Sequence, residues 1–267
     1  MDIYQKYNNL KEILREQKSI AVAFSGGVDS TFLLKTVHDV LGEKVIALTA
    51  DLSSFAENEL SETKKFCHEN KISQEICCVD EFEIPGFSQN PPDRCYICKK
   101  AIFTNLWKKT REKGFHVLVE GSNMDDCEDY RPGRRAIKEL EVLSPLQEVG
   151  LYKDEIRQLS KNLNLPTWKK PSFACLASRF VYGETITREK LLMVQKAETI
   201  LSELGFIQYR VRIHGMMARI EVPENDIGML IIPENRKQIT ERFKKLGFTY
   251  VTVDLQGFRS GSMNEIL

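Results

Sequence analysis

Three cysteines in two distant segments are the residues of this sequence best suited to bind a metal. Cys95 and Cys98 form a Cys-x-x-Cys pair in "DRCYICKK", and Cys175 lies far downstream in "FACLASRF". Such a pair occurs in redox, zinc and iron–sulfur sites. The redox interpretation expects the pair to open a helix, whereas the preceding "EIPGFSQNPPD" predicts an irregular loop. A structural zinc site needs four ligands, and only one matched pair is present.

Three thiolates would leave one coordination position open on a shared metal. That arrangement suits an iron–sulfur cluster in which one iron binds an exogenous ligand such as hydrosulfide. Buried or incidental thiols are the alternative. We assign that alternative to the four remaining cysteines, which are Cys67, Cys77, Cys78 and Cys127.

A second candidate site lies in "AVAFSGGVDSTFLLK". Gly26 and Gly27 allow a sharp turn and a close approach to a ligand, and Ser25, Ser30 and the first helical amides are donors for phosphate oxygens. Asp29 could hold Mg²⁺, which needs few protein carboxylates when phosphates supply further oxygens. An ordinary turn with a serine cap is the alternative. The lysine of the Walker motif and the glycine spacing of the dinucleotide motif are both missing.

Two further segments carry polar residues at strand ends or on strand faces. In "YRVRIH", Arg210 and Arg212 share one face of a predicted strand and could grip one phosphate, although a solvated strand face is the alternative. In "EGSNMDDCEDYRPGRRAIKE", Gly121 follows a predicted strand and precedes an asparagine and acidic residues. The alternative for that segment is a solvated acidic loop.

The elements that must position these residues alternate along the first part of the chain. Strands alternating with amphipathic helices predict an α/β fold with a doubly wound, mostly parallel sheet. Ligands of such sheets bind beyond the C-terminal strand ends, where Ser25, Asp51 and Gly121 fall. Helices are predicted over residues 4–17, 30–42, 56–70, 99–114 and 152–164, and strands over 19–24, 44–51, 73–82 and 115–121.

The pattern changes near residue 187. Helices over 188–205 and 234–247 and strands over 207–214, 217–223 and 248–255 indicate a smaller α+β domain. The 267 residues therefore divide into a domain over 1–186 and a second over 187–267.

Composition limits the class of partner and the compartment. The 38 basic and 38 acidic residues balance, so no net positive field favours a nucleic acid. No apolar run approaches the roughly 20 residues that span a bilayer, and the polar N-terminal stretch lacks a secretory pattern, so we expect a cytoplasmic protein. Seven cysteines, an odd number, argue against a disulfide framework.

The glycine-rich segment resembles the PP-loop of the ATP pyrophosphatases. These enzymes cleave ATP between the α and β phosphates, adenylate a substrate oxygen and let a nucleophile displace AMP. Together with "NPPDRCYICKK", "CLASRFVYGETIT", "RVRIHGMMARIEVP" and "FTYVTVDLQGFRSGSMN", the sequence resembles the LarE-type ATP-dependent sulfur transferases over nearly its whole length. The resemblance implies conversion of pyridinium-3,5-biscarboxylic acid mononucleotide to its bisthiocarboxylic form, for the nickel-pincer nucleotide cofactor.

The family has two sulfur sources. Some members sacrifice the sulfur of one cysteine, and others hold a [4Fe-4S] cluster with three cysteines and receive sulfide from a donor. Cys95, Cys98 and Cys175 match the second group, and Cys175 is four residues before Arg179, one fewer than the sacrificial cysteine is from its equivalent arginine.

The resemblance also implies roles for single residues and a homo-oligomeric assembly. ATP binding falls to Ser25, Gly26, Gly27, Val28, Asp29, Ser30, Asp51 and Gly121, with Mg²⁺ on Asp29. Catalysis falls to Cys95, Cys98, Cys175, Arg179 and Lys99, and the substrate phosphate to Ser178, Arg210 and Arg212. Glu198 matches a metal-linked carboxylate of hexameric members, but its usual aspartate partner corresponds to Met229.

Two other functions fit parts of the pattern. A PP-loop tRNA thiolase also combines this loop with three cysteines, but the neutral charge disfavours RNA. A non-catalytic nucleotide sensor that uses the cysteines for redox or zinc sensing would bind ATP without releasing pyrophosphate.

Overall fold

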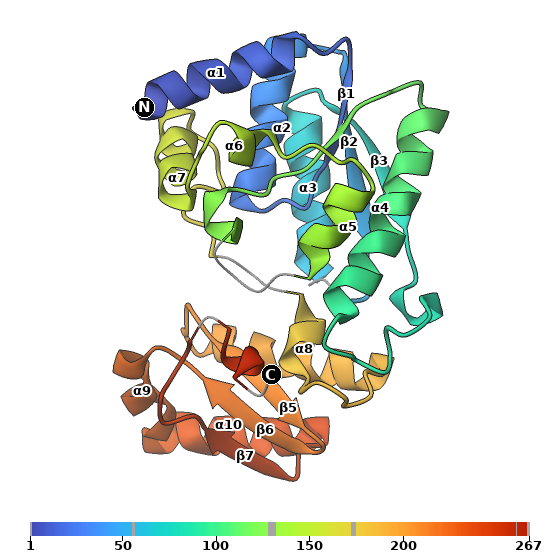
Figure 1. Ribbon diagram of the computed structural model, residues 1–267. Helices are drawn as coiled ribbons and strands as arrows, with labels where there is room; N and C mark the ends of the chain where they lie inside the picture. The colour runs from blue at the N-terminus through green and yellow to red at the C-terminus, as the bar shows by residue number, and fades with distance from the viewer. Residues whose placement is uncertain (1, 55–56, 128–131, 172–174, 260, 266–267) are drawn as a thin grey trace. The chain divides into compact units, whose positions relative to one another are not determined.

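The computed structural model describes residues 2–54, 57–127, 132–171, 175–259 and 261–265. The chain forms two compact units, the first from Met1–Ile84 and Cys95–Phe173 and the second from Pro85–Arg94 and Ala174–Leu267 (Figure 1). None of the helices among these residues is long and apolar enough to cross a membrane.

This division differs from the one predicted at residues 186 and 187. The stretch before residue 187 belongs to the second unit because it pairs with the early segment 85–94. The Gly183 and Ile186 N–H groups donate to the carbonyls of Asn90 and Ser88, each at 2.9 Å. The second unit therefore includes a ten-residue segment, Pro85–Arg94, that comes far earlier in the chain than the rest of the unit.

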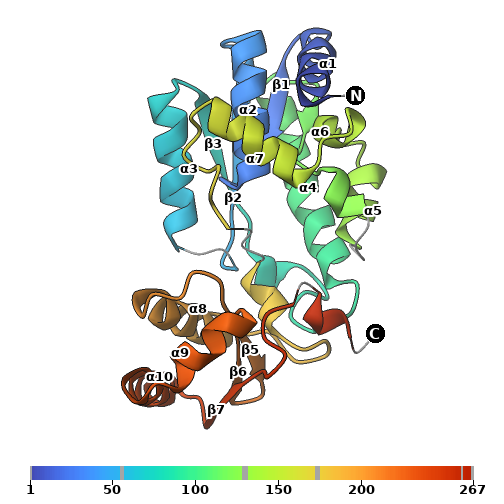
Figure 2. The same ribbon diagram turned by 90° about the vertical axis from the view of Figure 1, so that its left-hand side faces the viewer.

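The first unit is built on a parallel sheet in the order β3-β2-β1-β4, as the α/β prediction requires (Figure 2). Its strands are β1 (Ile20–Ala23), β2 (Val45–Asp51), β3 (Ser73–Cys78) and β4 (Leu118–Val119). Its helices are α1 (Ile3–Arg15), α2 (Val28–Leu41), α3 (Glu57–Glu69), α4 (Arg94–Glu112), α5 (Gly133–Glu139), α6 (Pro145–Glu148) and α7 (Lys153–Asn162).

The two faces of this sheet are covered by different helices, because strand side chains alternate between faces. Ile20 and Val22 of β1 join a core with residues of α1, α2, α3 and α7. Ala21 joins a second core with Ile102 and Leu106 of α4 and with residues of α5. Both faces are thus buried, and the C-terminal strand ends remain for the ligand loops.

The start of α4 corrects one expectation. The helix begins at Arg94 rather than at residue 99, so Cys95 and Cys98 lie at its opening and not in an irregular loop. Pro91 and Pro92 end the loop, and the Arg94 N–H donates to the Pro91 carbonyl at 2.9 Å, so the chain turns into the helix directly after them. Position at a helix opening therefore does not separate a redox pair from a metal pair.

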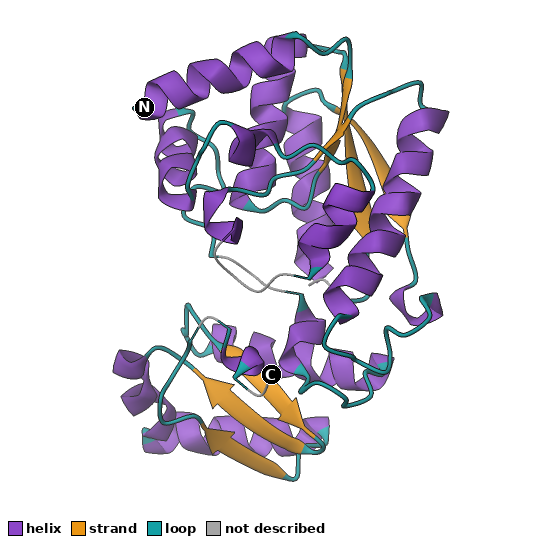
Figure 3. Cartoon of the chain, viewed as in Figure 1, coloured by secondary structure: helices purple, strands orange, loops and turns teal. Residues whose placement is uncertain are grey.

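The second unit has a small mixed sheet in the order β5-β6-β7, in which β5 and β6 are antiparallel and β6 and β7 parallel (Figure 3). Val211, Ile213, Ala218 and Ile220 are buried on one face. Charged residues alternate with them and occupy the other face. The elements are β5 (Arg210–His214), β6 (Met217–Glu221), β7 (Tyr250–Val253), α8 (Arg188–Glu203), α9 (Ile227–Ile231) and α10 (Pro233–Leu246).

Candidate active site

The turn between β1 and α2 has the geometry of a phosphate-binding loop. Gly26 has a φ of 74°, and a Cβ at this position would lie 2.9 Å from Thr63 Cγ2, so a side chain is excluded by conformation and by space. The Ser25 and Ser30 hydroxyls lie 3.1 Å apart at the mouth of the turn. Gly27 caps α2 without a side-chain hydrogen bond, which leaves the first helical amides for an anion.

The other predicted nucleotide residues lie at the same edge of the first unit. Gly121 lies two residues after β4, the strand next to β1, and a Cβ there would lie 3.0 Å from Ser30 N and 3.3 Å from Asp29 Cβ. Only glycine lets these two segments approach so closely. Asp51 is exposed at the C-terminal end of β2. The Val28 side chain is buried in the core, and its backbone N–H is the first of the α2 amides that face the turn.

Asp29 is the carboxylate best placed to hold a cation. Its Oδ1 is buried and has no hydrogen-bond partner among the described residues, while Oδ2 forms an ion pair with Lys153. Burial raises the pKa of Asp29, and the nearby Lys153 ammonium only partly offsets that rise. An orphaned carboxylate oxygen beside a phosphate loop fits Mg²⁺, which prefers one or two carboxylates together with phosphate oxygens.

Two lysines of this site were missed by the sequence reasoning. Lys153 reaches Asp29 from the first residue of α7, and Lys170 Nζ donates to the Gly26 carbonyl at 3.1 Å and to Glu62 at 2.6 Å. Neither belongs to a motif. The signal for Lys153 was its place in a first helical turn, where the helix dipole disfavours a cation without a partner.

The acidic segment after β4 is a folded loop with internal bonds. The Asn123 N–H donates to Asp126 at 3.0 Å, and the Asp125 N–H donates to the Asn123 side chain at 3.0 Å. Asp125 in turn accepts a 2.6 Å bond from the backbone N–H of Lys153. The loop therefore fixes the start of α7 and, with it, the lysine that pairs with Asp29.

The three candidate metal cysteines belong to both units. Cys95 and Cys98 lie in the first unit, one helical turn apart and so on one side of α4, and Cys175 lies in the second unit as the N-cap of the 3-10 turn Leu176–Arg179. Among the described residues no group of three or more His, Cys, Asp or Glu side chains is arranged to hold a metal ion. As a donor set, three thiols suit an iron–sulfur cluster with one open iron.

Cys98 and Lys99 have distinct neighbours in the first unit. The Cys98 thiol donates to Glu81 at 3.8 Å, and this fully buried carboxylate also accepts from the Ser54 N–H and hydroxyl at 2.8 and 2.6 Å. The Lys99 stem runs past Gly133, where a Cβ would lie 2.7 Å from Lys99 Cδ. Close packing of α5 on α4 thus limits where the Lys99 ammonium can lie.

The remaining cysteines differ from this set. Cys67 and Cys77 are buried in the two cores, and burial raises the pKa of Cys67 to about 12. Both thiols are therefore inert at neutral pH, as their packing role predicts. Cys78 is exposed. The side chain of Cys127 lies outside the described residues.

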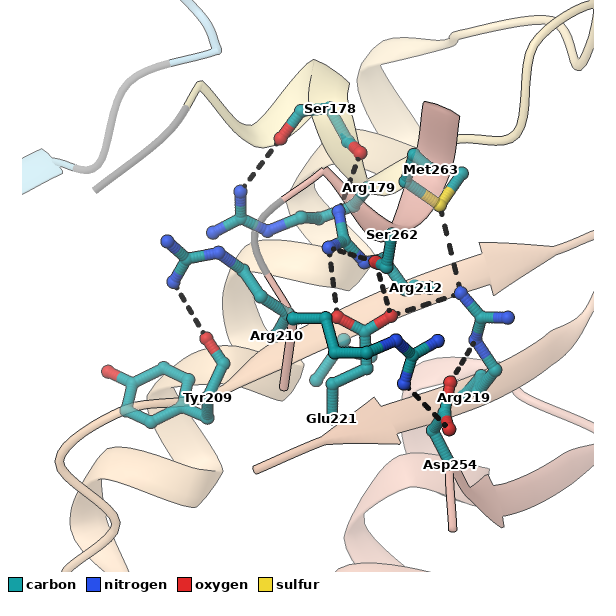
Figure 4. A network of polar contacts seen from close by, with 12 residues as sticks. Ser178, Arg179, Tyr209, Arg210, Arg212, Arg219, Glu221, Asp254, Ser262 and Met263 are labelled. Carbon is teal, nitrogen blue, oxygen red and sulfur yellow. Dashed lines mark hydrogen bonds and ion pairs between the residues drawn. The ribbon is translucent and has the colours of Figure 1, made fainter. Parts of the chain in front are cut away.

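Arg210, Arg212 and Arg219 of the second unit lie on the charged face of its sheet (Figure 4). Arg212 donates to the Ser178 carbonyl at 2.9 Å, to Glu221 at 2.8 Å and to the Ser262 hydroxyl at 3.0 Å. Arg219 bonds the other oxygen of Glu221 at 3.0 Å. This fully buried carboxylate is therefore the centre of the network, and Arg212 is held in place by it.

Arg179 is the most enclosed of these cations. Its side chain is 1% exposed and makes two bonds to Glu198, at 2.7 and 3.0 Å, while its Nη1 donates to the Ser178 hydroxyl at 2.9 Å. Glu198 also accepts from the Val211 N–H at 3.0 Å. Glu198 thus orients Arg179, and the exposed Met229 supplies no second carboxylate at the position of the family's aspartate.

Arg210 is the buried arginine most suited to bind an anion. Burial, Arg179 and Arg212 together lower its pKa to about 10, so it stays charged at neutral pH in an environment that repels a further cation. Its guanidinium donates to the Tyr209 carbonyl at 2.8 Å and lies 5.2 Å from the centre of the Phe258 ring. An arriving phosphate would relieve repulsion among the three arginines.

Sequence comparisons with known proteins agree with a phosphate-binding loop at this position. Residues 2–126 match the PP-loop domain family. The chain is 40% identical over 262 residues to an uncharacterized protein of Synechocystis, covering 98% of each. It is 36% identical to the pyridinium-3,5-bisthiocarboxylic acid mononucleotide synthase of Lactiplantibacillus plantarum, covering 98% of the chain and 95% of that protein. An uncharacterized protein of Methanocaldococcus jannaschii is 32% identical over 95% of each.

The fold and the phosphate loop define a PP-loop ATP-utilising enzyme. Within that class, the match over nearly the whole chain shows that it belongs to the LarE-type family of the pyridinium-3,5-bisthiocarboxylic acid mononucleotide synthases, as the sequence motifs predicted.

Proposed function

We propose that this protein is an ATP-dependent sulfur transferase that converts the carboxylates of pyridinium-3,5-biscarboxylic acid mononucleotide to thiocarboxylates. The observation that carries the proposal is the full-length similarity to a synthase of the bisthiocarboxylic product, in a chain with a complete phosphate loop. Two observations support it, namely the buried Asp29 oxygen that has no hydrogen-bond partner in the described part of the chain, and the enclosed arginines of the second unit.

The chemistry divides between the two units. In the first, a substrate carboxylate oxygen attacks the α-phosphorus of ATP, and pyrophosphate leaves. The Ser25 and Ser30 hydroxyls and the first amides of α2 would bind its oxygens, and Asp29 would hold the Mg²⁺ that offsets their charge. In the second, Arg210 would bind the phosphate of the mononucleotide, with Arg179 and Arg212 as its fixed neighbours.

Sulfide then attacks the acyl carbon of the adenylate, and AMP leaves with the oxygen that was activated. We propose that Cys95, Cys98 and Cys175 hold a [4Fe-4S] cluster, because three thiolates leave one iron open. The chemistry that such a cluster supplies is the delivery of bound sulfide as the nucleophile. Lys99, close to the cysteine pair in sequence, would stabilise the negative charge that develops on the substrate.

Separate assays of the two half-reactions test this proposal. Cys95→Ala, Cys98→Ala and Cys175→Ala should each abolish thiocarboxylate formation, followed by mass spectrometry, and spare pyrophosphate release. The matched control is Cys78→Ala, at an exposed thiol outside the set, which should keep both activities. Full turnover in one of the three variants would remove that cysteine from the mechanism. Zinc, or no iron after anaerobic reconstitution, would refute the cluster.

A further inference from the structure

The last part of the chain returns to the charged face of the sheet in the second unit. This C-terminal segment, residues 254–259 and 261–265, follows β7. The Phe258 N–H donates to the carbonyl of Val222, the residue after β6, at 2.8 Å. Gly257 has a φ of 70°, and a Cβ there would lie 2.8 Å from the same carbonyl. The segment is therefore anchored to the end of β6 at a point where only glycine fits.

Three residues of the C-terminal segment contact three arginines of the charged face, one each: Phe258 with Arg210, Ser262 with Arg212 and Met263 with Arg219. Figure 4 shows Ser262 and Met263 beside their arginines. The Ser262 hydroxyl oxygen lies 3.0 Å from Arg212 Nη2, whereas Met263 Sδ lies 3.8 Å from Arg219 Nη2. Ser262 is 5% exposed, so water competes little for its hydroxyl.

The two bonds of the Ser262 hydroxyl have a fixed direction. A guanidinium can only donate a hydrogen bond, and an ionised carboxylate can only accept one. The hydroxyl therefore accepts from Arg212 at 3.0 Å and gives its single hydrogen to Glu221 Oε1, also at 3.0 Å. Because Arg212 bonds to Glu221 directly at 2.8 Å as well, the three buried side chains form a closed ring of hydrogen bonds.

This ring decides which N–H groups of Arg212 are left for a ligand. A guanidinium has five N–H groups. Nη2 gives its two to Glu221 and Ser262, and Nη1 gives one to the Ser178 carbonyl at 2.9 Å. One N–H of Nη1 and that of Nε are left, and Nε has no hydrogen-bond partner among the described residues. Ser262 thus completes the hold on Nη2, while the rest of the guanidinium keeps donors for an anion.

We propose that Ser262 is a positioning residue for the phosphate of the mononucleotide, because its hydroxyl fixes the Arg212 guanidinium that binds this phosphate. A neutral hydroxyl holds the guanidinium without cancelling its charge, which a further carboxylate would do. Without the hydroxyl, one N–H of Nη2 would lack a partner in a buried site, and the guanidinium would have to be ordered when the ligand binds. The identity of the ligand rests on the proposed function, whereas the fixing of Arg212 does not.

Kinetics of pyrophosphate release test the effect on the substrate. In Ser262→Ala, Glu221 keeps its bonds to Arg212 and Arg219, so the variant should fold. We expect the KM for the mononucleotide to rise about five- to tenfold, because a hydrogen bond to a charged group is lost. The kcat should stay within about twofold and the KM for ATP should not change, a split that general destabilisation would not produce. The matched control is Ser202→Ala, at an exposed serine of α8, which should leave all three constants unchanged.

Chemical modification of Arg212 tests the fixing without any substrate. The full chain is treated with phenylglyoxal, and peptide mapping follows the modification of each arginine. Arg212 should react about fivefold faster in Ser262→Ala, and inorganic phosphate should protect it at lower concentration in wild type than in the variant. Arg236, at an exposed position of α10, is the internal standard and should react equally in both. If Ser262→Ala does not fold, Ser262→Cys decides the outcome, because its thiol bonds only weakly and should shift both measurements in the same direction.

The outcomes separate this inference from the proposed function. Unchanged modification of Arg212 in Ser262→Ala would overturn the inference and leave the proposed function intact. Faster modification with an unchanged KM for the mononucleotide would overturn it as well, because Arg212 would then not need to be fixed. Phosphate protection that depends on Ser262, in a protein that does not turn over the mononucleotide, would support the inference and refute the proposed substrate.

Discussion

The ion pair between Asp29 and Lys153 gives the sharpest prediction for the adenylation step. Lys153→Met removes the ammonium and keeps the length of the side chain. The side chains of the pair are 19% and 25% exposed, so the attraction is partly screened by solvent. We expect the substitution to cost the adenylation transition state about 1–2 kcal/mol of stabilisation, near the lower end for hydrogen bonds to charged groups. Pyrophosphate release at neutral pH should therefore fall about 5–30-fold.

The direction of the pH dependence follows from the causes of the Asp29 pKa. Burial raises this pKa and Lys153 lowers it, so Lys153→Met leaves burial unopposed and raises it further. The ionised carboxylate then forms only at higher pH, and the acidic limb of the pH profile for pyrophosphate release should move to higher pH. The rates of pyrophosphate release of wild type and variant should converge as the pH rises. A difference that comes directly from the missing lysine charge should remain.

The assay is pyrophosphate release from ATP in the presence of the pyridinium dicarboxylate mononucleotide, measured across pH. Lys161→Met, at an exposed lysine of the same helix, is the matched control and should leave the profile unchanged. In an Asp29→Asn background, Lys153→Met should not move the acidic limb. An acidic limb at the wild-type position in Lys153→Met would refute the reasoning.

Two further predictions concern packing. Glu198→Gln should lower the free energy of unfolding, measured in urea, by about 3–5 kcal/mol, because it leaves the buried Arg179 without its anion. Glu203→Gln on the same helix breaks an exposed pair and should change the free energy of unfolding by less than about 1 kcal/mol. Equal urea midpoints in the two variants would contradict this prediction. Gly121→Ala should weaken ATP binding in calorimetry, because its Cβ would lie 3.0 Å from Ser30 N. Gly228→Ala, whose Cβ meets nothing within 4 Å, should bind ATP as wild type does. Equal ATP affinities would show that the close approach of Gly121 to Ser30 is not needed for binding.

Much of the fold could be predicted because its signals are local. The strand, the two glycines and the apolar helix of the phosphate loop follow one another in sequence, and the helix stops at Gly42 and Gly247 coincide with positive φ values. The parallel direction of the strands then follows from the alternation of strands and helices. The helix over Gly133–Glu139 was missed, since its charged sequence resembles a solvated loop.

The candidate site was predicted where residues form motifs and missed where they act from a distance. Lys153 and Lys170 reach the loop from positions 124 and 144 residues away, and no spacing in the sequence reports such contacts. Similarly, Arg210 and Arg212 were predicted as an equivalent pair. Their described contacts differ, because Arg212 donates to the fully buried Glu221 at 2.8 Å, whereas Arg210 donates to the Tyr209 carbonyl at 2.8 Å.

The excursion of the chain through residues 85–94 also constrains how the protein is made. Phe87 in this segment is 1% exposed in the finished fold, and its unit is completed only by residues after 173. Synthesis of the intervening 79 residues, from 95 to 173, takes about 4–16 s at typical rates of translation. For that time the nascent chain carries Phe87 before the residues that complete its unit have been made. A gene cut after residue 173 would leave segment 85–94 on the first fragment and the rest of the second unit on the other. The second unit would then be incomplete in both fragments, so neither fragment should be stable when it is expressed alone.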